Sequence, residues 1–301
     1  MNAHPYRGRF APTPSGPLHF GSLVAALGSY LDAKAHAGEW LLRIEDVDPP
    51  RVVAGATDAI LRGLEAFGFA WDGPPIHQSR NGATYQAALD RLDALGLAYG
   101  CQCSRKEIVE IAPLGVDGPV YPGTCRNLGW RGDPAREPAW RFRVPDVRVE
   151  FRDRLLGRVA CDLERECGDF VLKRADGVFT YQLAVVVDDA DEGITHVVRG
   201  ADLLTSTPRQ IALQQAWGYP TPLYLHLPVV LDAEGYKLSK QTLAAPLDEG
   251  RPLPALLQAA RHLGMAPPSG IGGVSEFWLW ASAAWQPAVM PVLRGKKLVK
   301  T

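Results

Sequence analysis

Two short segments, far apart in the chain, carry side chains suited to binding phosphate. The first, Pro17–Ser22 (PLHFGS), follows a proline-rich loop and opens a predicted helix. A helix N-terminus attracts anions, because its backbone N–H groups and its dipole point at them. His19 can donate a hydrogen bond to a phosphate, and Gly21 lets a flat base or a ribose approach the backbone closely. Taken alone, the segment also fits an ordinary helix start.

The second segment is Tyr236–Gln241 (YKLSKQ), beside Gly235. Its two lysines, Lys237 and Lys240, could stabilise the negative charge that develops on a transferring or leaving phosphate. Taken alone, the segment also fits a solvated basic loop.

The cysteines suggest a metal site. Three of the five lie close together in the sequence, at Cys101, Cys103 and Cys125. Met1–Arg7 has no apolar signal core, so we expect a cytoplasmic protein. In that compartment a cysteine cluster is typical of metal ligands rather than of disulfides.

Charge and composition exclude some classes of protein. Lys and Arg total 32 and Asp and Glu 33, so the net charge of −1 excludes a uniformly basic nucleic-acid binder. It does not exclude a local basic face. The hydrophobic content of 47% is too high for a disordered chain. No apolar run approaches the roughly 18 residues of a membrane span, so we expect no membrane partner.

The elements around the first segment predict a parallel sheet. A strand over 7–10 leads through the loop 11–17 into a helix over about 19–37, and a strand follows over 40–44. This order is a βαβ unit.

The rest of the chain predicts mixed elements. Residues 101–168, with the cysteines and many glycines and prolines, resemble a small inserted module. The run 183–187 fits either a buried strand or a helix. Further predicted elements are helices over about 57–67 and 83–95, a hairpin over 169–181, a strand ending at 199, and short helices beyond 241. Another helix is expected to begin at Pro208, with Ser206 or Thr207 as its cap, and to run to about Trp217.

The two phosphate-binding segments together resemble the signature motifs of class I aminoacyl-tRNA synthetases. Four further stretches are similar to the glutamyl branch of that class: 9–19 (RFAPTPSGPLH), 42–48 (LRIEDVD), 181–189 (YQLAVVVDD) and 198–204 (VRGADLL). Within this branch the chain resembles the shortened glutamyl-queuosine tRNA(Asp) synthetases. It has HFGS where the parent enzymes usually have HIG, and its second motif ends in Gln241 rather than Ser. Too few residues follow Gln241 for the large helical anticodon-binding domain of the parent enzymes.

The resemblance implies an α/β fold with a Rossmann-like parallel-sheet catalytic domain, an inserted zinc-containing module and a short helical C-terminal part. The expected division is 1–100 and 169–235 for the two halves of the catalytic domain, 101–168 for the zinc and acceptor-binding module, and 236–301 for the KLSKQ loop and the C-terminal part, without an anticodon-binding domain.

The resemblance also implies the reaction. The family activates L-glutamate with ATP and Mg²⁺ to glutamyl-adenylate, and then transfers glutamate to the queuosine base at the wobble position of tRNA(Asp). Two alternatives stay open: a truncated glutamyl-tRNA synthetase that charges tRNA(Glu), and a catalytically silent synthetase-like RNA-binding protein.

Site residues are carried over by motif. Arg9 and Arg199 are expected to pair with the carboxylates of glutamate. Glu45 would hold its ammonium group, and Tyr181 would add a hydroxyl contact. Phe10, Ala11, Pro12 and Thr13 would form the loop wall. The predicted ATP site consists of His19, Gly21, Ser22 and Lys240, and the predicted catalytic residues are His19, Lys237 and Lys240.

The family's zinc site is similar to Cys101, Cys103, Tyr121 and Cys125, which implies one structural zinc ion per chain. Tyrosine is an unusual zinc ligand. Cys161 or Cys167 could instead supply a fourth thiolate, or both could be small buried apolar residues.

The sequence leaves two interpretations open for the residues that could contact RNA. Four arginines alternate along a predicted hairpin and would line an RNA path or form the solvated face of a strand pair. They are Arg148, Arg152, Arg154 and Arg158. A basic tail of Arg294, Lys296, Lys297 and Lys300 would contact phosphates or fray.

Overall fold

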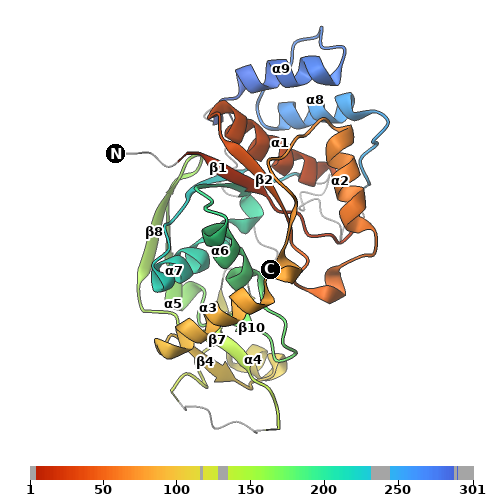
Figure 1. Ribbon diagram of the computed structural model, residues 1–301. Coiled ribbons are helices and arrows are strands. Elements are labelled where there is room, and N and C mark those ends of the chain that lie inside the picture. The colour runs from red at the N-terminus through yellow and green to blue at the C-terminus, as the bar shows by residue number, and fades with distance from the viewer. Residues whose placement is uncertain (1–4, 116–117, 128–134, 232–244, 288–289, 291–301) are drawn as a thin grey trace.

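The computed structural model describes residues 5–115, 118–127, 135–231, 245–287 and 290, and Figure 1 shows their arrangement. The helices are α1 (Phe20–Ala35), α2 (Ala56–Ala66), α3 (Gly82–Ala94), α4 (Arg105–Ile111), α5 (Leu163–Glu166), α6 (Tyr181–Asp191), α7 (Thr207–Trp217), α8 (Pro252–His262) and α9 (Val274–Ala284). The strands are β1 (Arg7–Phe10), β2 (Glu39–Ile44), β3 (Ile76–His77), β4 (Ala98–Cys101), β5 (Leu114–Gly115), β6 (Gly118–Pro119), β7 (Ala139–Phe142), β8 (Arg148–Asp153), β9 (Gly157–Asp162), β10 (Val171–Lys173), β11 (His196–Gly200) and β12 (Leu223–Leu227).

Parallel strands form the base of the site, as predicted. β2 pairs in parallel with both β1 and β3, and β11 pairs in parallel with β12. β1 lies beside the start of β11, where the Thr195 N–H donates to the carbonyl of Arg7 at 2.9 Å. The predicted βαβ unit is therefore confirmed as β1, α1 and β2, and the carboxyl ends of these strands meet on one edge.

Helix α1 packs closely over this sheet because its inner face is apolar and contains a glycine. Leu23, Leu27 and Leu31 on that face are almost completely buried. A Cβ atom added to Gly28 would lie 2.5 Å from Cδ1 of Leu227 on β12. The small residue thus allows α1 to approach β12, and this brings the start of the helix near the strand ends.

A second apolar core lies in the lower half of Figure 1, where α3, α6 and α7 pack near β4, β7 and β10. β7 pairs antiparallel with both β4 and β10. The run 183–187 belongs to helix α6 and is buried. The predicted hairpin over 169–181 is present but short, because helix α6 begins at Tyr181. Lys173 and Phe179 form an antiparallel bridge, the N–H of Arg174 donates to the carbonyl of Val178 at 2.8 Å, and the N–H of Thr180 donates to the carbonyl of Leu172 at 2.9 Å.

The hairpin of β8 and β9 carries the four arginines, and they have different environments. Arg148 and Arg158 both pair with Glu150 on its exposed face, and Arg152 is also exposed. Arg154 fits neither prediction, because it turns inward to form an ion pair with Asp32 of α1, where the Nη2–Oδ1 distance is 2.9 Å. A fully buried carboxylate requires such a partner.

The same hairpin lies against the parallel strands, since the N–H of Arg154 donates to the carbonyl of Tyr224 on β12 at 2.9 Å. The division of the chain at 101–168 remains a prediction.

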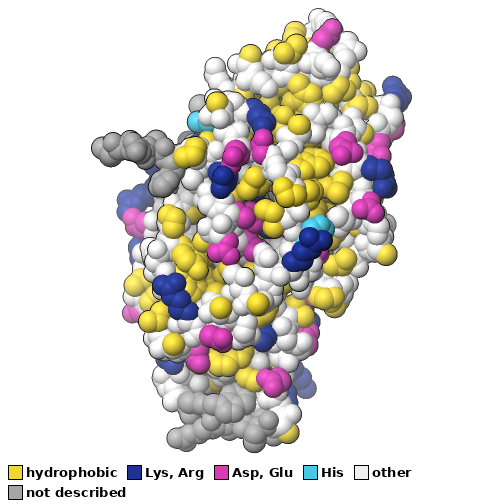
Figure 2. Space-filling model, in the orientation of Figure 1, with side chains coloured by type: hydrophobic (Ala, Val, Ile, Leu, Met, Phe, Trp, Pro, Cys, Tyr) yellow, Lys and Arg dark blue, Asp and Glu magenta, His cyan; other side chains and the backbone are white. Residues whose placement is uncertain are grey.

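The predicted short helices near the C-terminus are present as α8 and α9, which pack on α1 at the top of Figure 1. The indole of Trp285 donates to the carboxylate of Asp32 at 3.1 Å and ties this part to α1. Among the described residues, no helix is both long and apolar enough to span a membrane. On the face shown in Figure 2, acidic and basic side chains are interspersed rather than gathered by sign.

Candidate active site

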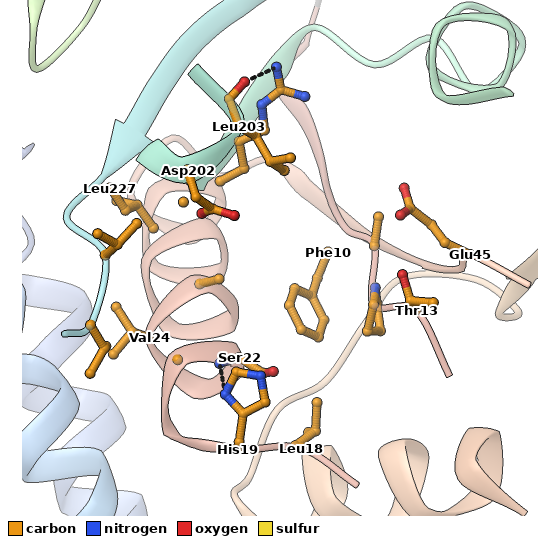
Figure 3. Close-up of a pocket in the computed structure, with 18 of the residues that line it drawn as sticks. Phe10, Thr13, Leu18, His19, Ser22, Val24, Glu45, Asp202, Leu203 and Leu227 are labelled. Carbon is orange, nitrogen blue, oxygen red and sulfur yellow. Dashed lines mark hydrogen bonds between the residues drawn. The ribbon is translucent and has the colours of Figure 1, made fainter. Parts of the chain in front are cut away.

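A cavity of about 710 Å³ opens at the carboxyl ends of the parallel strands, beside the start of α1 (Figure 3). Every described residue that was predicted to bind glutamate or ATP lines it. These residues are Arg9, Phe10, Ala11, Pro12, Thr13, His19, Gly21, Ser22, Glu45, Tyr181 and Arg199. The volume suits a ligand larger than an amino acid alone. The individual roles of these residues stay predictions.

His19 caps the helix that was predicted to face phosphate. Its Nδ1 accepts a hydrogen bond from the backbone N–H of Ser22 at 3.3 Å, drawn as a dashed line in Figure 3. A neutral histidine whose Nδ1 accepts carries its hydrogen on Nε2. His19 can therefore order the first turn of α1 and donate a hydrogen bond through its other ring nitrogen.

Glu45 follows the last residue of β2 and is held by its backbone, because its N–H donates to the carbonyl of Pro12 at 3.0 Å. Its carboxyl group borders the cavity across from Asp202 (Figure 3). Burial raises the pKa of Glu45 to about 7, against the lowering effect of the guanidinium groups of Arg43 and Arg9. A cationic ligand group at this carboxylate would reverse that shift.

Arg199, on β11, is a buried cation that lines the cavity, and its hydrogen-bond partners in the described part of the chain are uncharged. Its Nη1 donates to the hydroxyl of Tyr181 at 3.1 Å, and its Nη2 donates to the hydroxyl of Thr207 at 2.8 Å. Its Nη2 also lies 3.5 Å from the carbonyl of Leu203, the contact drawn in Figure 3, and its Nε lies 3.3 Å from Nε2 of His226. These partners orient the guanidinium without neutralising its charge, so an anionic ligand can do so.

Arg9 is held differently. Its Nε and Nη2 donate to the two carboxylate oxygens of Asp189 on α6, at 2.9 Å and 3.2 Å. Asp189 also accepts from Arg43 at 2.7 Å, and Arg43 in turn contacts Glu192. The charge of Arg9 is thus balanced inside the protein, although its side chain borders the cavity.

Three charged side chains of the cavity, Glu45, Arg199 and Arg9, act on the hydroxyl of Tyr181. Burial raises the pKa of its hydroxyl, Glu45 raises it further, and Arg199 and Arg9 oppose the shift. The cavity therefore offers the carboxylate of Glu45, the guanidinium of Arg199 with its neutral partners and the hydroxyl of Tyr181, which suit an amino acid with an ammonium and a carboxylate. Asp202 and Arg51 also line it.

Lys237 and Lys240 lie outside the described residues, as do Arg294, Lys296, Lys297 and Lys300. The described residues that follow position 244 contact the first motif. The N–H of Leu247 donates to the carbonyl of Leu18 at 3.0 Å, and Pro246 forms a bridge with His19.

The predicted metal ligands come together at the end of β4. The Sγ atoms of Cys101, Cys103 and Cys125 all lie within 4.8 Å of one another. The hydroxyl oxygen of Tyr121 lies 3.4 Å from the Sγ atoms of both Cys101 and Cys103 and accepts from the Cys125 N–H at 2.9 Å. Three sulfurs and one oxygen around a common centre form a donor set that suits tetrahedral zinc.

The local environment shifts the pKa values of two of these thiols in opposite directions. Burial raises the pKa of Cys103 to about 11. Burial alone would also raise the pKa of Cys125, but hydrogen bonds with Tyr121 and Cys103 lower it below its usual value.

Cys161 and Cys167 form a separate buried pair, with their Sγ atoms 3.7 Å apart, in the second apolar core. They are not part of the cluster of three sulfurs. This arrangement favours the interpretation of both as small core residues and leaves Tyr121 as the fourth group at the cluster.

Sequence reasoning missed the residues that support the site. Asp189 was quoted within a motif but was given no role, and His226, Thr207 and Asp153 were not identified. The available signals were weak: two acidic residues after an apolar run, and a single histidine within the apolar strand LYLHL.

Comparisons with known proteins agree with this geometry. Residues 6–274 match the family described as tRNA synthetases class I (E and Q), catalytic domain. A protein of Dechloromonas aromatica named glutamyl-Q tRNA(Asp) synthetase is 57% identical over 97% of both chains. A protein of the same name from Chromobacterium violaceum is 56% identical over 95% of both chains.

Solved structures of glutamate tRNA ligases are also similar. One, from Elizabethkingia meningosepticum in complex with its amino acid, has a TM-score of 0.78 and 27% identity. The match covers 95% of this chain and 66% of that chain. The chain therefore belongs to the class I tRNA synthetases of the E and Q type, within the family named glutamyl-Q tRNA(Asp) synthetase.

Proposed function

We propose that this protein activates L-glutamate with ATP and transfers the glutamate to queuosine at the wobble position of tRNA(Asp). The names of relatives that are 57% identical over nearly the full length support the proposal. The observation that carries it is a single cavity lined by both an amino-acid-type site and the N-terminus of α1. Adenylate formation needs this continuity, because the substrate carboxylate must meet the α-phosphorus of ATP.

In the first step, a carboxylate oxygen of glutamate attacks the α-phosphorus of ATP, and the bond to the β-phosphate breaks to release pyrophosphate. Glu45 holds the ammonium group and Arg199 a carboxylate, so the reactants are aligned. The N-terminus of α1, with His19, stabilises negative charge on the phosphates. Gly21 and Ser22 lie beside it, and Lys237 and Lys240 supply further positive charge as the pyrophosphate leaves.

In the second step, a hydroxyl of the queuosine cyclopentenediol attacks the carbonyl carbon of glutamyl-adenylate. An ester forms and AMP leaves. The proton of the hydroxyl goes to solvent or to the departing AMP.

The proposed function involves two kinds of metal ion. Mg²⁺ enters bound to ATP, since triphosphates carry it to such sites. One structural zinc ion would be held by Cys101, Cys103, Cys125 and Tyr121, whose donor atoms converge at the end of β4. When bound, zinc would fix the fold of the segment around it, because four protein ligands leave no position for substrate. We further propose that the reaction takes place in the cytoplasm, where its tRNA substrate is found.

The test uses the purified protein with ATP, labelled glutamate and tRNA(Asp) with or without queuosine. To exclude charging of the terminal ribose, the 3′-terminal adenosine is removed from both tRNAs. Label is expected only on the tRNA that carries queuosine, and periodate oxidation of that tRNA abolishes it. Label on intact tRNA(Glu) alone would support a glutamyl-tRNA synthetase instead.

A second measurement separates activation from transfer. Glutamate-dependent exchange between ATP and pyrophosphate reports the first step without tRNA if the adenylate forms in its absence, and it is repeated with tRNA present. A Lys240→Ala variant should bind glutamate but exchange far more slowly. No exchange under either condition would support a silent RNA-binding protein.

A further inference from the structure

Three buried side chains from separate elements meet behind the cavity. Arg199 lies on β11, Thr207 is the first residue of α7, and His226 lies on β12. Nη2 of Arg199 lies 2.8 Å from the Thr207 hydroxyl, that hydroxyl lies 3.0 Å from Nε2 of His226, and Nε of Arg199 lies 3.3 Å from the same Nε2. Thr207 and His226 are inaccessible to solvent. The three side chains therefore form a closed triangle of hydrogen bonds.

The carboxylate of Asp153 contacts the other ring nitrogen of His226. Oδ2 of Asp153, at the end of β8, lies 2.7 Å from Nδ1 of His226 and accepts from the backbone N–H of His226 at 3.0 Å. Its other oxygen accepts from the N–H groups of Leu155 and Leu156 at 2.9 Å and 2.8 Å. Burial alone would raise the pKa of Asp153, yet these hydrogen bonds hold it below its usual value. An ionised Asp153 fixes the hydrogen of His226 on Nδ1.

With its hydrogen on Nδ1, His226 presents the lone pair of Nε2 to the guanidinium and to the Thr207 hydroxyl. A protonated His226 would instead place a second positive charge beside Arg199. Burial lowers the pKa of His226 more than the hydrogen bond to Asp153 raises it. The neutral form is thus the one that the surroundings favour.

We propose that Asp153, His226 and Thr207 are positioning residues that aim Arg199 at the carboxylate of the bound amino acid without neutralising its charge. The inference rests on the proposed function, in which Arg199 binds glutamate. The contrast with Arg9 supports it. Arg9 is held by a carboxylate, Asp189, which would compete with an anionic ligand. Arg199 is held by neutral acceptors, and the carboxylate of Asp153 acts on it through the imidazole of His226.

The decisive variant is Thr207→Val, which removes the hydroxyl and keeps the shape of the side chain. If Thr207 aims Arg199, the KM for glutamate rises by roughly tenfold to hundredfold, as expected for a lost hydrogen bond to a charged group. The KM for ATP and the kcat stay within about twofold in the exchange assay, because in the proposed function Arg199 binds the amino acid and not ATP. Thr207→Ser keeps the hydroxyl and should restore the KM for glutamate.

A merely structural role gives another pattern. It predicts a lower melting temperature with both KM values unchanged, and that result would overturn the inference. Tyr224→Phe, on the strand that carries His226, is the matched control. It removes a buried hydroxyl that accepts from Gln214 at 3.0 Å, and it keeps the ring that faces the guanidinium of Arg199. It should lower stability without changing the KM for glutamate.

A second measurement does not depend on the activity of any variant. Nitrogen NMR of histidine-labelled protein, assigned with His226→Gln, should show His226 neutral with its hydrogen on Nδ1 at about pH 7. A hydrogen on Nε2 would overturn the inference even if Thr207→Val did not fold. An inactive wild-type protein would count against the proposed function, and the imidazole spectrum would still decide on the hydrogen-bond chain.

Discussion

Arg9 of β1 and Asp189 of α6 form a buried ion pair with two hydrogen bonds, of 2.9 Å and 3.2 Å, between residues far apart in the sequence. The pair joins the first strand of the sheet to the helix that carries Tyr181. This pair also makes the two arginines that were predicted to bind glutamate different from each other. Of these two, only Arg199 lacks a carboxylate partner among the described residues. We infer that Arg199 receives the substrate carboxylate and that Arg9 maintains the wall of the cavity.

Asp189→Asn should destabilise the protein strongly. Arg9 and Arg43 would lose a shared counter-charge in the interior, and breaking a buried pair typically costs about 3–5 kcal/mol. Urea unfolding measures the change in the free energy of unfolding. Asp191→Asn, at an exposed position on the same helix, is the control. A loss below about 1 kcal/mol in Asp189→Asn would contradict this account of the pair.

Arg199→Lys should weaken glutamate binding although it keeps the positive charge. A lysine has a single ammonium group and cannot contact Tyr181, Thr207 and a ligand in one plane. We expect the KM for glutamate to rise by roughly tenfold to hundredfold in the exchange assay. Arg174→Lys, at a more exposed arginine that pairs with Asp48, should leave this KM unchanged. Equal effects of the two substitutions would rule out a specific role for Arg199.

Glu45 should make glutamate binding depend on pH. Its pKa is raised to about 7, and the ammonium group of the substrate requires the ionised carboxylate. The KM for glutamate should therefore fall by about tenfold between about pH 6 and about pH 8, following the ionised fraction. Glu45→Gln should bind weakly with a flat profile over this range, and an unchanged slope in that variant would assign the titration to another group.

The same group affects stability with a defined sign. Between its ordinary 4.5 and about 7, Glu45 is protonated in the folded protein and ionised in the unfolded chain. The folded state binds more protons there, so the contribution of Glu45 to the free energy of unfolding falls as pH rises through this window. Thermal melts of the wild type and Glu45→Gln, compared across that range, check the sign.

Cys103→Ser should remove the proposed zinc ion. Its Sγ lies 3.5 Å from that of Cys125 and 3.4 Å from the Tyr121 hydroxyl, so a hydroxyl in its place would leave a weaker ligand set. Elemental analysis is expected to find about one zinc per chain in the wild type and much less in the variant. Cys161→Ser, in the separate buried pair, should retain the metal. Zinc-free wild-type protein from a chelator-free preparation would refute the site.

Local sequence patterns were enough to identify many of the residues that line the cavity. The βαβ unit followed from the local pattern of strand, loop, helix and strand, because apolar periodicity and the helix start at His19 are properties of neighbouring residues. The motifs at 9–19, 42–48 and 198–204 then named residues that line one cavity. The three cysteines were also identified by their spacing and lie together.

How those residues are held depends on tertiary packing. Arg9, Arg154 and Arg199 are the same residue type in the sequence, yet one pairs with Asp189, one with Asp32, and one with neutral groups. Each partner comes from a distant element, and local patterns carry no record of which buried charges meet. The free energy of burying a charge depends on the groups that surround it in space, so packing decided which arginine keeps its charge available for a ligand.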